Sequence, residues 1–276
     1  MLTTILCIII RILSNSYINV FQKLLTSIGT KSSSINFCTY LGLVVLSVFW
    51  GLNLIDLLNS EILFNTLIMG ILGALGNYYI IKALSLGELS TLAPINSYKP
   101  IFALIIGFLY LGEIPSIYTN IGILLIILGT YFISYNNNII ANKKAILFRI
   151  LALIFSSAEA IFIKKIIMLV GVNTSFFLWA LSGFIFSLIL FKLSNHRFKI
   201  INFRYHIILI LLVFIMQYVT NFIFSRMQVA PALALFQLST LLSVFLGVKI
   251  FKEKNFLQKI TASIIMVIGA VIILLF

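Results

Sequence analysis

The chain has 276 residues, of which 62% are hydrophobic and only 9% are charged. Soluble domains carry roughly 25% charged residues, so this chain has too little polar surface to cover a water-soluble globule. The net charge of +13 collects mostly at the ends of apolar stretches, where basic residues meet lipid headgroups. No basic stripe with interleaved aromatic residues indicates nucleic-acid binding. Composition therefore predicts an integral membrane protein whose partners include membrane lipid and no nucleic acid.

Apolar stretches of about 20 residues, the length that crosses a bilayer, recur from end to end. The backbone must satisfy its own hydrogen bonds in lipid, so each stretch is predicted to be a helix. The first one lacks a basic n-region and a cleavage site, and we expect a spanning helix there rather than a signal peptide. The ten predicted spans are roughly 2–24, 34–52, 62–84, 88–111, 115–135, 145–168, 174–193, 205–226, 229–250 and 256–276.

An asparagine-rich loop near residue 140 divides these spans into two sets of five, residues 1–138 and 139–276. Because each set has an odd number of spans, the second set enters the membrane the opposite way round. We therefore expect an all-α integral membrane fold of ten transmembrane helices, built as two inverted five-helix repeats with the substrate site between them. The repeat rests on a shift of 140 residues, which places Gly107, Glu113 and Gly129 on Gly247, Glu253 and Gly269.

The same positions carry a family resemblance. Ala83-Leu84, Pro100, Leu111-Gly112-Glu113 and Gly129-Thr130 follow one another in the first half, and Glu253 and Gly269 continue the pattern in the second. In these residues the chain resembles the EamA-like family of the drug/metabolite transporter superfamily. The resemblance implies a gradient-driven flux of small metabolites. Thr240 stands where the second-half proline is expected, so the substrate of better-known relatives is not carried over.

Lys99 is the most informative single residue. It precedes Pro100 in the middle of the stretch 89–113, so both fall near the bilayer midplane, where an ammonium is costly and freed carbonyls can act as ligands. One interpretation is that Lys99 holds an anionic group of a substrate, and the other is that it pairs with a buried glutamate and locks two helices. Glu159 is the counterpart candidate. It could pair with Lys99, carry a proton or bind an amino group, or it could lie beside Lys164 near the headgroups.

Polar side chains on the predicted third, fourth, eighth and ninth helices are expected to share a cavity with these two, the alternative being hydrogen bonds between helices. Lys23 and Lys165 are expected to snorkel to the headgroups. Arg11 is deeper and stays a weaker candidate, and Glu113 and Glu253 are expected to cap the helices that follow them. The predicted substrate-binding residues are Lys99, Tyr98, Asn96, Glu159, Tyr78, Asn77, Gln217 and Gln237.

No catalytic or ATP-binding motif occurs in context, and neither histidine has a Cys or carboxylate at metal-ligand spacing. We expect no enzyme activity, metal or cofactor. The sequence predicts a secondary transporter of a small polar or anionic metabolite, such as an amino acid, working by alternating access as a monomer or homodimer. Heavy Ile, Asn, Lys and Phe usage favours a bacterial inner membrane. The alternative is a non-transport membrane protein, such as a lipid-handling enzyme or a structural helper. Charge counting groups Lys143, Lys144 and Arg149 in one basic cluster at the membrane surface and favours termini outside, whereas family habit favours termini inside.

Overall fold

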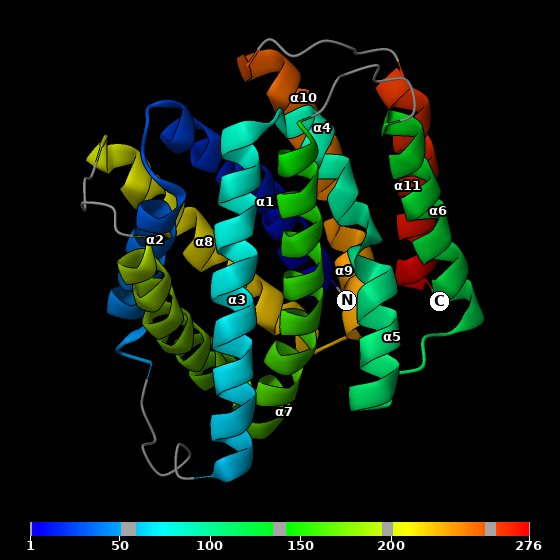
Figure 1. The fold of residues 1–276 in the computed structure, drawn as a ribbon. Helices are drawn as coiled ribbons and strands as arrows, with labels where there is room; N and C mark the ends of the chain where they lie inside the picture. The colour runs from blue at the N-terminus through cyan, green and yellow to red at the C-terminus, as the bar shows by residue number, and fades with distance from the viewer. Residues whose placement is uncertain (1, 51–58, 135–141, 195–200, 252–257, 276) are drawn as a thin grey trace.

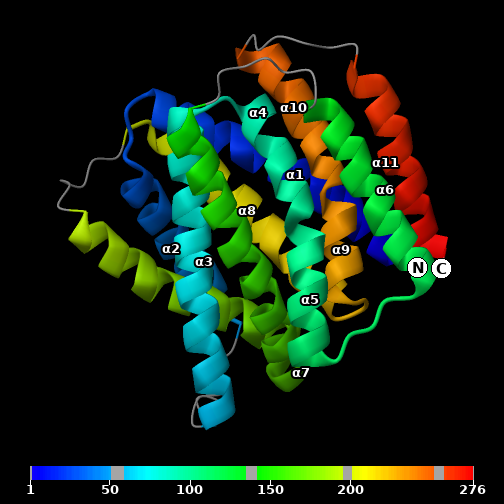
Figure 2. The ribbon, with the colours of Figure 1, turned by 45° about the vertical axis from the view of Figure 1, so that its right-hand side comes forward.

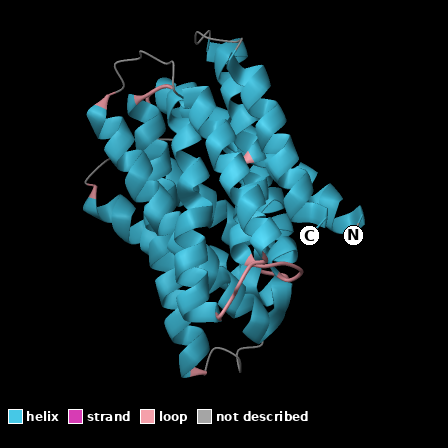
Figure 3. Ribbon diagram, turned by 90° about the vertical axis from the view of Figure 1, so that its right-hand side faces the viewer, coloured by secondary structure: helices cyan, strands magenta, loops and turns pink. Residues whose placement is uncertain are grey.

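The computed structural model describes residues 2–50, 59–134, 142–194, 201–251 and 258–275. Helices and connecting loops make up all of these residues, so the expectation of an all-helical chain is confirmed for the described part (Figure 3). The elements in chain order are α1 (Leu2–Ser27), α2 (Ser32–Ser47), α3 (Ser60–Leu86), α4 (Leu89–Leu92), the 3-10 helix η2 (Ala93–Tyr98), α5 (Lys99–Leu111), α6 (Ile117–Ser134), α7 (Lys143–Leu193), α8 (Phe203–Phe224), α9 (Val229–Phe236), α10 (Leu238–Phe251) and α11 (Gln258–Leu275).

Within the described residues, six stretches are long and apolar enough to cross a membrane, and three shorter apolar helices lie beside them. The outer surface carries large apolar side chains, such as Leu109, which is 76% exposed, and Ile117, which is 72% exposed. Apolar groups at this density on the outside suit lipid and not water. The chain is thus an integral membrane protein. The start of α1 and the end of α11 lie at the same end of the molecule (Figures 1 and 2).

Helix α7 covers two segments that the sequence predicts as separate spans, 145–168 and 174–193. It runs over 51 residues and is sharply bent at Gly171, whose φ of 80° and ψ of 178° are not helical. A side chain is strained at this positive φ, so glycine is the residue that lets the chain turn here. The bend directs the second part of α7 across α3, where Ser182 lies against Gly70, toward α2 (Figures 1 and 2).

Two further stretches are broken helices. The first runs through α4, η2 and α5, with a proline near the start of η2 and Pro100 at the start of α5. The second is interrupted between α9 and α10 at Gln237. The two breaks meet, because the Asn96 side-chain amide donates to Gln237 Oε1 at 3.3 Å. Broken helices at membrane depth are tolerated where they line a cavity, so these breaks point to the centre of the protein as a site.

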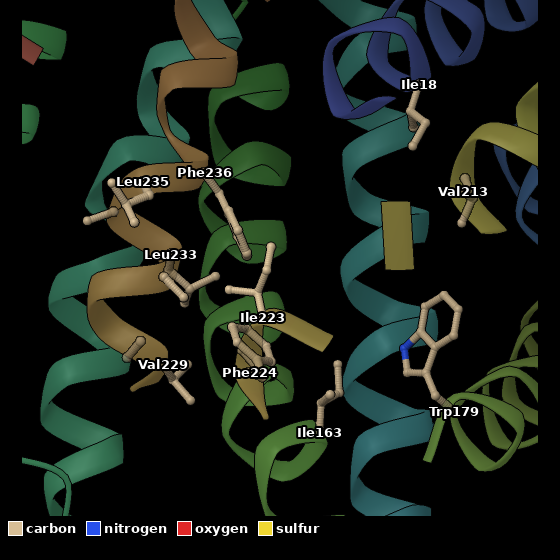
Figure 4. Packing of buried hydrophobic residues seen from close by; sticks show 14 of the residues in the cluster. Ile18, Ile163, Trp179, Val213, Ile223, Phe224, Val229, Leu233, Leu235 and Phe236 are labelled. Atoms are coloured by element: carbon tan, nitrogen blue, oxygen red, sulfur yellow. The ribbon is translucent and has the colours of Figure 1, made fainter. Parts of the chain in front are cut away.

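Helices α6 and α11 pack side by side at one edge of the molecule (Figure 1). A Cβ added at Gly122 would lie 2.7 Å from the Gly269 carbonyl oxygen, and one added at Gly269 would lie 2.6 Å from the Gly122 oxygen. The two backbones approach so closely only because neither residue has a side chain. On the inner side, a buried cluster joins α9 to α7 and α8, and includes Leu233, Phe224 and Phe236 (Figure 4).

Glu113 caps a helix, but not the one expected. Its Oε2 accepts a hydrogen bond from the Val229 backbone N–H at 2.8 Å, so it caps the start of α9 and not that of the following helix, α6. The expectation was wrong because a carboxylate at the end of α5 reaches a helix start that is far away in sequence and close in space. Gln228 supports the same contact by donating to the Ile114 carbonyl at 3.3 Å. Glu253 lies outside the described residues.

Candidate functional site

A polar cavity lies in the middle of the helical bundle. It has a volume of about 120 Å³. One water molecule needs roughly 10–15 Å³ of such a volume, so the cavity suits a small metabolite and its waters. Its walls come from α1, α2, α3, η2, α5, α7 and α8. The lining residues are Arg11, Asn15, Ile18, Asn19, Gln22, Thr39, Tyr40, Leu43, Gly73, Asn77, Ile80, Asn96, Lys99, Arg149, Ser156, Glu159, Trp179, Val213, Met216 and Gln217.

Lys99 lines this cavity at the first residue of α5, immediately after η2. Among the described residues it makes no hydrogen bond and no ion pair within 4.0 Å, although it interacts electrostatically with Glu159, Arg11 and Arg149. The interpretation that Lys99 locks two helices through a direct pair with Glu159 therefore finds no contact in this conformation. An ammonium that lines a cavity without a partner is available to a ligand.

Glu159 lines the same cavity from the first part of α7. Its Oε1 accepts a hydrogen bond of 2.6 Å from the Trp179 indole N–H. Gly73 of α3 makes room for this carboxylate, since a Cβ at that position would lie 2.3 Å from Oε1 and 3.1 Å from the Tyr40 hydroxyl oxygen. The carboxylate is therefore positioned by the second part of α7, through Trp179, and by α3, through Gly73. Lys164 does not pair with it, and donates instead to the carbonyls of Phe224 and Met227.

Helix α1 contributes a polar stripe that the sequence interpretation missed. Arg11, Asn15, Asn19 and Gln22 are spaced by four, four and three residues, which places them on one helical face, and all four line the cavity. All four bind other helices: Arg11 Nε donates to Thr220 Oγ1 at 2.7 Å and Asn15 to Ser239 Oγ at 2.8 Å. Asn19 donates to Ser243 Oγ at 3.3 Å, and Gln22 to Asn77 Oδ1 at 3.0 Å. Their spacing was the signal that could have identified the stripe.

Arg149 was grouped by sequence with the basic residues at the headgroups, and this placement is wrong. The side chain is only 4% exposed, and its Nε donates to the Leu92 carbonyl at 3.0 Å. Helix α7 begins at Lys143, so a rise of about 1.5 Å per residue carries Arg149 roughly 9 Å below that end and into the cavity wall. Leu92 offers its carbonyl because the helix is broken there.

Five of the eight predicted binding residues line the cavity: Lys99, Glu159, Asn96, Asn77 and Gln217. Gln237 does not line it but supports Asn96, and it is 2% exposed. The other two lie elsewhere.

Tyr98 is 40% exposed, so its side chain points away from the centre. Tyr78 packs its ring against Tyr79, with centroids 5.4 Å apart, and lies 5.3 Å from Lys82 Nζ. Each tyrosine neighbours a cavity residue in sequence, Lys99 and Asn77, but adjacent residues of a helix point in directions about 100° apart.

The remaining charged residues lie near the ends of the helices. Lys165 pairs with Glu61 at 3.0 Å, and Lys23 Nζ donates to the Gly87 carbonyl at 3.4 Å. That these two side chains reach the headgroups stays a prediction. Within the described part of the chain, no group of three or more His, Cys, Asp or Glu side chains is arranged to hold a metal ion.

Residues 2–135 match the model of the EamA-like transporter family. The first half of the chain is thus similar to this family. Members of the EamA-like transporter family are membrane transporters, typically without enzymatic activity, and the match leaves the substrate open.

The chain also matches solved structures over most of its length. Twenty-eight chains of solved structures are similar to it. One of them, described only as "Crystal structure of protein", has a TM-score of 0.74 and 14% sequence identity, and the match covers 98% of this chain and 96% of that chain. At this identity the likeness shows the fold alone. No curated protein matches the sequence.

Proposed function

We propose that this EamA-like protein is a secondary transporter that moves a small polar or anionic metabolite, such as an amino acid, across the cytoplasmic membrane of a bacterium. The observation that carries the proposal is the cavity in the centre of the bundle, in which Lys99 has no partner among the described residues. A transporter needs a site of this kind near the midplane, and a charge there is expensive unless a ligand uses it.

The proposal includes ten membrane crossings arranged as two inverted halves, residues 1–138 and 139–276. The order of the helices supports it, because the bend at Gly171 turns α7 into two crossings, and each broken helix counts as one. Both halves build the cavity: α1, α3 and α5 come from the first, and α7 and α8 from the second. An even number of crossings also agrees with termini at the same end of the molecule.

Alternating access requires contacts between the halves that can open on one side while the other side closes. The hydrogen bonds from Arg11 to Thr220 and from Asn15 to Ser239 join the halves beside the cavity. Glu113 bound to the Val229 N–H joins them at the end of α5. Rocking of one half against the other would exchange such contacts. Because one chain builds the whole cavity, a monomer suffices, and a homodimer would hold two independent sites.

Counterflow in proteoliposomes tests the function. Vesicles that contain the purified protein are loaded with one unlabelled amino acid or organic acid and then given the same compound, radiolabelled, outside. We expect at least one compound to accumulate transiently with the wild-type protein and not with Lys99→Gln. A panel without any flux, or flux that Lys99→Gln leaves unchanged, would contradict the proposal and favour a non-transport role.

A further inference from the structure

The cavity is unusually rich in positive charge for a site inside a membrane. Among its lining residues are three cations, Arg11, Lys99 and Arg149, and one carboxylate, Glu159, which leaves a formal charge of +2. Charges at membrane depth are retained only where something compensates them. Since the described residues that line the cavity supply no second carboxylate, the compensation must come from what enters the cavity.

Arg11 has hydrogen-bonding capacity to spare. Its Nε is used by Thr220, and the guanidinium carbon lies 4.7 Å from the centre of the Phe236 ring. Its Nη1 is buried and has no hydrogen-bond partner. A guanidinium carries five N–H donors, and a buried one without an acceptor is costly. An anionic group in the cavity would supply that acceptor.

Arg149 and Lys99 add two further cations to the lining of the cavity. Arg149 is held by the Leu92 carbonyl of the broken helix, whereas Arg11 is held by α8 and α9, so the two guanidinium groups are fixed by different helices. Lys99 interacts electrostatically with both of them. A ligand in this cavity therefore meets cations that are held by different helices.

The Glu159 carboxylate is poorly placed to bind a ligand's amino group, because it is already engaged by protein groups. Its Oε1 already accepts the Trp179 N–H, and the same oxygen packs against Gly73. The carboxylate is held against α3 at the edge of the cavity. A zwitterion would present its ammonium to a site dominated by three cations, which like-charge repulsion disfavours.

From these contacts we infer that the transported compound is a small dianion, either a dicarboxylate or a phosphate monoester. This inference rests on the transport function proposed above and specifies its substrate class. Two negative charges neutralise the formal charge of the cavity, and carboxylate and phosphate oxygens both suit the paired N–H groups of arginine. The volume of about 120 Å³ limits the compound to a short carbon chain.

Thermal unfolding of the purified full-length protein tests the class, because a ligand that binds the native state raises its melting temperature. The probes are succinate and glycerol 3-phosphate as dianions, lactate as a monoanion, alanine as a zwitterion and glycerol as a neutral compound, all in chloride at one ionic strength. We expect one or both dianions to raise the melting temperature in a saturable way and the other probes to leave it unchanged. The larger shift identifies the carboxylate or the phosphate as the preferred group.

Variants assign the shift to the cavity. Lys99→Gln and Arg149→Gln should raise the apparent dissociation constant of the effective dianion at least about tenfold. A loss of about 1.4 kcal/mol of interaction free energy gives this factor. Lys143→Gln is the matched control on the same helix, because it removes one positive charge at the exposed start of α7 and should bind as the wild type does. Arg149→Lys guards against a folding defect, since it keeps the charge.

The outcomes separate the two proposals. If alanine or lactate stabilises the wild type but not Lys99→Gln, and the dianions have no effect, the dianion class is wrong and transport through this cavity stands. If none of the probes produces a shift that depends on Lys99, the dianion class and the cavity as binding site are both overturned. If Lys143→Gln and Arg149→Gln reduce the dianion-induced rise in melting temperature equally, the rise comes from nonspecific electrostatics. That result also overturns the inference.

Discussion

Replacing Lys99 with glutamine should make the empty protein more stable while it removes binding. Lys99 makes no hydrogen bond or ion pair among the described residues, so the substitution breaks no specific contact. The charge loses hydration in the cavity wall, is attracted by Glu159 and is repelled by Arg11 and Arg149. The loss of hydration is the largest of these effects, ahead of the attraction and the two repulsions.

The size of the gain follows from the cost of burying a lysine. An ammonium at the bilayer centre costs about 2.5–3.5 kcal/mol on insertion scales, and polar walls reduce this. We therefore expect Lys99→Gln to raise the free energy of unfolding by about 1–3 kcal/mol. Each kcal/mol corresponds to a shift of about 2–4 °C in melting temperature for a chain of similar length.

Thermal melts of the detergent-purified protein without ligand measure this shift, and the matched control is Lys165→Gln. That substitution breaks the exposed pair with Glu61 and should lower stability by about 0–1 kcal/mol, the opposite sign. A fall of several degrees for Lys99→Gln would refute the reasoning, because it would mean that Lys99 is a structural partner of Glu159 and not a free binding group.

Three further substitutions test the positions of individual groups. Gly73→Ala should displace the Glu159 carboxylate and reduce counterflow severalfold, whereas Gly76→Ala, whose added Cβ has no neighbour closer than 3.4 Å, should transport normally; equal activity of the two would contradict the placement of Glu159. Gly122→Ala should force α6 and α11 apart and lower the unfolding free energy by about 1–3 kcal/mol in thermal melts, so an unchanged melting temperature would count against that contact. Glu113→Ala should leave the Val229 N–H without its acceptor and lower the unfolding free energy by about 1 kcal/mol in the same assay. Glu113→Gln keeps an acceptor oxygen and should lose much less stability, so identical losses in both variants would argue against the cap.

The helical segments and the importance of Lys99 could be predicted from the sequence, because both follow from the hydropathy and the length of the apolar stretches. Twenty apolar residues must form a helix in lipid, and a lysine beside a proline at midplane depth needs an explanation. The bend at Gly171 was also within reach, since a break was expected between residues 168 and 174. These features depend on local sequence, and they are present in the structure.

The cavity wall was harder to predict because it depends on rotation and depth. Arg149 was assigned to the headgroups, since its distance from the membrane surface depends on where α7 starts. Tyr98 was placed in the site because it precedes Lys99, yet the 3-10 turn directs it outward. Only the partner of Glu113 was beyond the sequence altogether, because Val229 lies 116 residues away.

The stripe on α1 is a different case, because its periodicity was visible. Arg11, Asn15, Asn19 and Gln22 follow helical spacing on a span that is otherwise mostly apolar. Polar residues on one face of a spanning helix indicate a shared surface with other helices or with water. Taken together with Lys99 and Glu159, the stripe would have predicted a cavity that includes α1.

The central claim is that the cavity opens in turn to the two sides of the membrane. Thiol labelling of Ile80→Cys measures this directly, in a background where Cys7 and Cys38 are replaced by alanine. Ile80 lines the cavity, whereas its neighbour Ile81 is fully buried away from it and gives the control Ile81→Cys. A membrane-impermeant maleimide is applied to oriented vesicles from one side and then, in separate samples, from the other. We predict that Ile80→Cys is labelled from both sides and Ile81→Cys from neither, whereas labelling of Ile80→Cys from one side only, with and without a transported compound, would contradict alternating access.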